Sequence, residues 1–71
     1  MPPHDDHRIQ YARAVGARLR LEVALAQLQA ARAEVSIVLG ENHPSVPHGD
    51  EACLSTRKMA ALLDLAIRRL P

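Results

Sequence analysis

The chain has 71 residues, of which 48% are hydrophobic and 24% are charged, with a formal net charge of +1. It contains one tyrosine, no phenylalanine or tryptophan, and a single cysteine, Cys53. The length predicts a single domain, the lone cysteine excludes a disulfide framework, and no apolar run is long enough for a membrane span. The first ten residues hold no apolar stretch, so we expect no signal peptide and a cytoplasmic location.

The first predicted element is a long helix from about residue 6 to residue 39. This segment contains no proline and is rich in Ala, Leu, Arg, Glu and Gln, all strong helix formers. Asp5 or Asp6 can serve as its N-cap, and Gly40 stands where a helix C-terminal stop belongs. Residues 1–5 predict a disordered polar tail.

The second predicted element is a shorter helix over residues 51–70. Residues 40–50 hold two prolines and two glycines, which predicts a loop, and Asp50 then offers a second N-cap. The expected fold is therefore all-α, an antiparallel hairpin of two helices that forms one domain over residues 6–70. We expect dimerisation to complete a four-helix bundle.

The long helix carries two apolar stripes, whereas an ordinary surface helix has one. The second helix can cover only one of them, through a predicted heptad seam of Ala52, Thr56, Met59, Leu63, Ala66 and Leu70. The predicted hairpin core comprises Leu21, Leu28, Val35, Met59, Leu63 and Leu70. The other stripe lies nearly opposite and predicts an intermolecular interface of Val15, Leu19, Val23, Ala26, Ala30 and Ile37.

A bare apolar stripe on so short a chain indicates association with protein, because a lone hairpin buries little surface. The hypothesis is a small protein-interaction module that acts through apolar helix faces, as a homodimeric adaptor, regulator or chaperone-like subunit. Docking on a larger protein partner and a marginally folded monomer are the alternatives.

A dimeric, basic, nucleic-acid-binding regulator is the second functional class. Four arginines form a stretch without acidic residues: Arg8, Arg13, Arg18 and Arg20. They are scattered around the helix axis, however, and Tyr11 is the only aromatic side chain that could stack on a base. The near-zero net charge also argues against a dedicated polyanion binder.

The sequence offers few residues for chemistry. His4, His7, His43 and His48 are many histidines for this length, but their spacing matches no metal-binding motif, so we expect neither metal nor other cofactor. An antiparallel dimer would be needed to bring the two histidine pairs together. Cys53 has no oxyanion-hole motif nearby and is interpreted as a small apolar filler. The chain is predicted not to be an enzyme.

The segment Leu39-Gly40-Glu41-Asn42-His43-Pro44-Ser45-Val46 resembles the linker between tetratricopeptide repeats of the kinesin-light-chain type, where a Leu-Gly…His-Pro…Val stretch joins two helices. The resemblance covers these eight residues only, and no second repeat follows where about three are needed for such a fold. It implies a protein-binding helical scaffold. Residues 46–49 are expected to break the chain where the family continues its helix.

Overall fold

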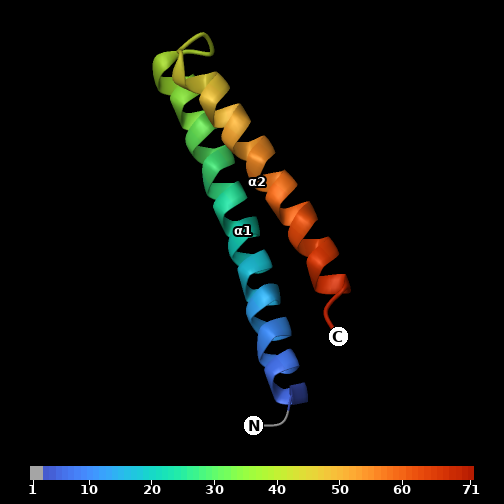
Figure 1. Ribbon diagram of the computed structural model, residues 1–71. Helices are drawn as coiled ribbons and strands as arrows, with labels where there is room; N and C mark the ends of the chain where they lie inside the picture. The colour runs from blue at the N-terminus through green and yellow to red at the C-terminus, as the bar shows by residue number, and fades with distance from the viewer. Residues whose placement is uncertain (1–2) are drawn as a thin grey trace.

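The computed structural model describes residues 3–71 as two helices joined by a short turn (Figure 1). Helix α1 spans Pro3–Leu39 and helix α2 spans Ser45–Arg68. The two helices run antiparallel, and both ends of the chain lie at the same end of the rod. No strand occurs within residues 3–71, which confirms the predicted all-α helical hairpin.

Helix α1 ends where the sequence predicts but begins earlier. Gly40 has a φ of 93°, in the left-handed region that closes a helix and that glycine adopts without steric cost. At the other end, residues 3–5 are helical and belong to α1 rather than to a disordered tail. Pro3 suits the first helical position because its fixed φ is helical and its missing N–H would have no acceptor there. Residues 1 and 2 lie outside the described part of the chain.

Helix α2 begins at Ser45, inside the segment 40–50 that the sequence predicts to be a loop. Pro44 is the N-cap, and Pro47 lies in the first turn. The first four N–H groups of a helix have no intrahelical acceptor, so neither proline removes a helical hydrogen bond. The two prolines therefore start a helix where their composition suggested an irregular loop.

The earlier start of α2 corrects two further expectations. Asp50 is an interior residue of α2 instead of its N-cap, and the linker shrinks to residues 40–44. The chain also stays helical through residues 46–49, where a break was expected. Gly49 lies against the other helix, and a Cβ atom there would be 3.0 Å from Cγ of Arg32. This glycine permits close helix packing and does not form a turn.

The hairpin is a rod, with extents of 56 × 15 × 13 Å and a radius of gyration of 16.7 Å. A compact chain of this length would have a radius of gyration of about 11 Å. The accessible surface is 5502 Å², whereas a compact monomer of this mass exposes about 4,400 Å². Figure 1 shows α1 continuing beyond the end of α2, so its first turns have no helix beside them.

The seam between the helices follows a heptad repeat on each of them. The seam of α1 comprises Ala14, Arg18, Leu21, Leu25, Leu28, Arg32 and Val35. The seam of α2 comprises Val46, Gly49, Cys53, Thr56, Ala60, Leu63, Ile67 and Leu70. Only Val46, Cys53 and Ala60 are buried within the described hairpin, and no large side chain is fully buried there. The interior is thus a single thin row of side chains.

Met59 is the predicted core residue that the structure places elsewhere. Its side chain points away from α1 and the residue is 58% exposed. Ala60 faces α1 in its place, because a small side chain there lets the two helix backbones approach closely. The predicted seam therefore mixed residues from two neighbouring columns of α2.

Candidate protein-interaction surface

Two arginines occupy seam positions of α1 that apolar residues would ordinarily fill. Nε of Arg18 donates to Asp64 at 2.9 Å, and its Nη1 donates to Glu22 at 3.2 Å. Nε of Arg32 donates to Asp50 at 2.9 Å. The two arginines are two heptads apart and so are the two aspartates, so both ion pairs fit one antiparallel register. Such partly exposed pairs contribute up to about 1 kcal/mol each, which makes them markers of register more than sources of stability.

A second polar cluster ties the end of α1 to the turn. Nη2 of Arg32 donates to Glu41 at 2.8 Å, and the Ser36 hydroxyl also donates to Glu41. The Ser36 hydrogen bond, followed by that of Arg32, lowers the pKa of Glu41. Hydrogen bonds to Asp50 and Glu41 raise the pKa of Arg32. The guanidinium of Arg32 thus joins α1, the turn and α2.

His43 has a structural role at the start of α2. Its Nδ1 accepts the backbone N–H of Ser45 at 3.2 Å and lies 2.7 Å from the Ser45 hydroxyl. Pro44, the N-cap, makes no side-chain capping hydrogen bond. The imidazole supplies the acceptor that the first free N–H of the helix lacks. No motif in the sequence announces this role.

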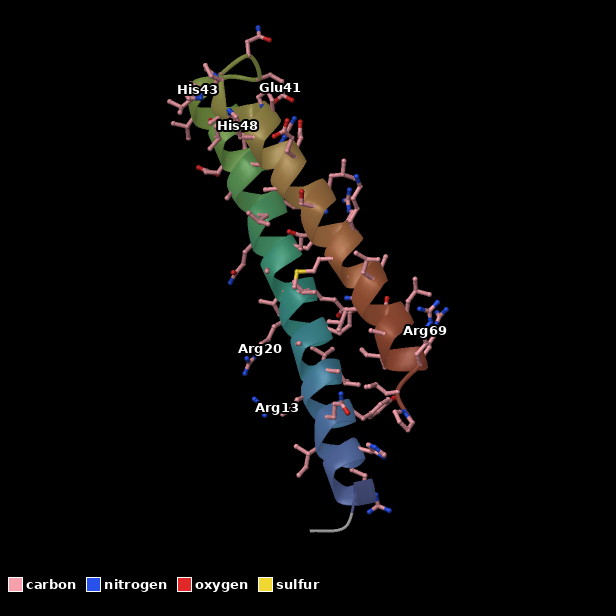
Figure 2. All side chains as sticks on the ribbon, in the orientation of Figure 1. Arg13, Arg20, Glu41, His43, His48 and Arg69 are labelled. Carbon is pink, nitrogen blue, oxygen red and sulfur yellow. The ribbon has the colours of Figure 1, made fainter. Side chains whose placement is uncertain are left out.

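The other candidates for chemistry are dispersed. Figure 2 shows His43 and His48 at the loop end, whereas His7 lies near the opposite end of α1. The side chain of His4 lies outside the described residues. No three His, Cys, Asp or Glu side chains within the described part come together as a metal site. Cys53 is a free thiol buried in the seam.

The predicted interface residues lie on the side of α1 that faces away from α2. We call this surface the outer stripe: Val15, Leu19, Val23, Ala26, Ala30, Ala33 and Ile37. Leu19 is 56% exposed, Val23 58% and Ile37 78%, while Val15 at the edge is partly buried. From residue 19 to residue 37 the stripe keeps alternating spacings of four and three, which is the pattern of a coiled-coil seam.

A second uncovered apolar surface runs along one side of the hairpin. We call it the side face: Ala17, Ala24, Ala31, Val38, Ala52, Met59, Leu62 and Ala66. The opposite side of the seam is polar and carries Glu22, Gln29, Ser36, Asp50, Arg57 and Asp64. The sequence contains a signal for the side face that the prediction missed, a second series at spacings of three and four on α2. This series comprises Ala52, Ser55, Met59, Leu62 and Ala66.

Charge is segregated along the rod. Residues 30–53, around the turn, carry four acidic side chains and one arginine, so this half has a net charge of −3. The remaining residues carry eight basic and four acidic side chains, a net charge of +4 with histidines neutral. Figure 2 shows Arg13 and Arg20 projecting from α1 on the side away from α2, far from Glu41 at the turn. The hairpin is therefore a dipolar rod with two apolar surfaces.

Known proteins do not place this hairpin in a family. No family model, curated protein or solved structure matches the chain. The segment over residues 39–46 stays a local resemblance, since α1 alone has 37 residues and a whole tetratricopeptide repeat has about 34. Within residues 3–71, neither helix combines the length and the apolar composition of a membrane span.

Proposed function

We propose that the chain is a small protein-interaction module that works as a homodimer, in the role of an adaptor, regulator or chaperone-like subunit. One observation carries this proposal, the contrast between what the described hairpin buries and what it exposes. The buried residues are Val46, Cys53 and Ala60, all small or medium in size. The exposed residues include Leu19, Val23, Ile37, Val38, Met59 and Leu62.

The energetics of so thin a core favour association. Ordering a residue costs about 1.5 kcal/mol in conformational entropy, and the burial of apolar area must offset that cost along the whole rod. Monomeric proteins in water rarely leave long contiguous apolar surfaces uncovered. A second copy of the chain packed on the outer stripe would remove Leu19, Val23 and Ile37 from water.

The position of the outer stripe determines how four helices would be arranged. Because the stripe lies nearly opposite α2, two copies joined through it would place both α1 helices in the centre and both α2 helices outside. Each α1 would then have a helix on two sides, which accounts for its two apolar stripes. Docking of one hairpin on a larger protein would use the same surface.

Sedimentation at micromolar concentration tests the proposal. We expect the native chain to sediment as a dimer and Val23→Asp to sediment as a monomer, because a buried, unpaired carboxylate is strongly unfavourable. Leu65→Asp is the matched control, since Leu65 lies on the outer side of α2 and is 45% exposed. This variant should remain dimeric.

Other outcomes would count against the homodimer. An unchanged mass for Val23→Asp would contradict an interface on the outer stripe. A native chain that sediments as a folded monomer would contradict the homodimer and leave the larger partner as the explanation of the stripe.

Nucleic-acid binding is the second candidate, supported by the net charge of +4 in the half of the rod away from the turn. Duplex DNA would bind there through its phosphates, with an affinity that falls steeply as salt rises. A mobility shift lost in the variant Arg13→Glu/Arg20→Glu would favour this function. No shift at low salt would exclude it for duplex DNA.

A further inference from the structure

We infer that two copies of the chain pack through the outer stripe in antiparallel orientation, with a two-fold axis level with residue 28 and Arg20 of each copy paired with Glu34 of the other. This inference rests on the proposed homodimer and adds its orientation and register. The evidence is the order of apolar and charged residues along α1.

The outer stripe is self-complementary in the antiparallel register. In a pair of antiparallel helices, the two core columns of one helix face the opposite columns of the other, and the residues that face each other have a constant sum of numbers. A two-fold axis at residue 28 makes every layer apolar. The layers, from the ends to the centre, pair Leu19 with Ile37, Val23 with Ala33 and Ala26 with Ala30. The smallest side chains lie at the axis, where the two helices can approach most closely.

The edge of the stripe shows matching charge complementarity. At heptad spacing it carries Arg13, Arg20, Gln27 and Glu34, basic at one end and acidic at the other. The same two-fold axis places Arg20 opposite Glu34 of the second copy, twice, and Gln27 opposite its equivalent. The other edge brings Glu22 opposite Ser36 and creates no pair of like charges.

Arg20 and Glu34 have no counter-ion inside the hairpin. Neither forms an ion pair within residues 7–71, in contrast to Arg18 and Arg32. The residues three and four positions from each of them are all Ala, Gly, Val or Ile, so no acidic or basic neighbour is in helical reach. Figure 2 shows Arg20 pointing away from α2. The charges that would pair in the dimer are thus free in the single hairpin.

The overall charge distribution favours the same orientation. Antiparallel packing lays the half with net charge +4 along the half with net charge −3, whereas parallel packing lays like charge on like charge. The rod is 56 Å long, several times the Debye length of about 8 Å at physiological salt, so each half interacts mainly with the part beside it.

Cysteine cross-linking distinguishes the two orientations. In a Cys53→Ala background, we expect Val23→Cys and Ala33→Cys chains to form a disulfide-linked dimer only when they are mixed. Each variant alone should remain uncross-linked, because its two cysteines would be separated by ten residues of helix. The control Ala31→Cys, on the side face, should not cross-link.

The outcomes separate the inference from the proposed function. Cross-linking of Val23→Cys with itself would show a parallel dimer and overturn the inference, as would cross-linking of Ala31→Cys. Monomeric sedimentation of the native chain would instead overturn the proposed homodimer.

A charge swap tests the Arg20–Glu34 pairs directly. Arg20→Glu or Glu34→Arg alone should raise the dimer Kd roughly tenfold, since each creates two repulsive pairs. The double variant restores both attractions and should return the Kd to within about threefold of the native value. Lys58→Glu, on the outer side of α2, is the control and should change the Kd less than the single variants. A native Kd in both single variants, or no rescue in the double variant, would overturn the register.

Discussion

Glycine residues have different roles at each of three positions in the hairpin. Gly40 ends α1 with a positive φ of 93°, Gly49 makes room for the stem of Arg32, and Gly16 has no atom within 4 Å of the Cβ position. The same residue type is therefore required by the backbone at one site and by packing at another. At Gly16 nothing inside the hairpin requires it.

Alanine substitutions should separate these roles. Gly40→Ala should lower the free energy of unfolding by about 1 kcal/mol or more, because an L side chain is strained at this φ. Gly16→Ala should raise it by about 0.5–1 kcal/mol through helix propensity. Urea unfolding at pH 7 measures both, and a stabilising Gly40→Ala would contradict the helix-stop geometry.

The cluster around Glu41 predicts a pH dependence. Hydrogen bonds from Ser36 and Arg32 hold the pKa of Glu41 below its ordinary value of 4.5. As the pH falls below that value, the unfolded chain binds the proton first, so the stabilisation present at neutral pH is lost as the pH passes through the lower folded-state pKa. Urea unfolding at pH 7 and pH 3 should show a smaller loss of stability for Glu41→Gln than for the native chain.

Glu51→Gln is the control for this pH effect, because the Glu51 side chain is 79% exposed. It should keep the pH dependence of the native chain. Equal pH profiles for the native chain and Glu41→Gln would show that the cluster does not form in solution.

At the scale of elements, the seam depends on small side chains of α2. Cys53 and Ala60 face α1, and Gly49 continues the same side of the helix toward the turn. Arg18 and Arg32 can occupy seam positions because their stems lie over these small residues while the guanidinium groups reach the edge. Close approach of the helices and the two ion pairs thus belong to one arrangement.

Ala60→Leu should destabilise the hairpin, because the larger side chain forces the helices apart. Overpacking of this kind costs about 1–3 kcal/mol. The neighbouring Ala61 is exposed, so Ala61→Leu is the matched control and should change stability by less than about 0.5 kcal/mol. Chemical denaturation of both variants checks this, and equal stabilities would contradict the assigned seam.

At the scale of the whole molecule, an extended rod with few buried residues should be stabilised by its own concentration. If folding and association are coupled, Tm should rise by roughly 5–10 °C between 1 and 100 μM chain. Val23→Asp should remove this dependence and Leu65→Asp should keep it. A Tm of the native chain that does not change with concentration would contradict coupled association.

The sequence by itself determined the features that depend on short stretches of chain. Helix propensity and periodicity predicted two helices, Gly40 predicted the end of α1, and the double stripe on α1 located residues such as Leu19 and Val23, which the structure leaves exposed. These features are local because propensity, capping and heptad spacing act within a few turns of one helix.

Only the tertiary structure decided where α2 begins and which of its columns faces α1. Pro47 is compatible with a helix in the first turn but not further inside, so its effect depends on a boundary that composition does not set. Ala60 is chosen over Met59 because close contact between two helices favours the smaller residue, and that preference exists only once both helices are present. The pairing of Arg18 with Asp64 likewise depends on a register that one helix alone does not have.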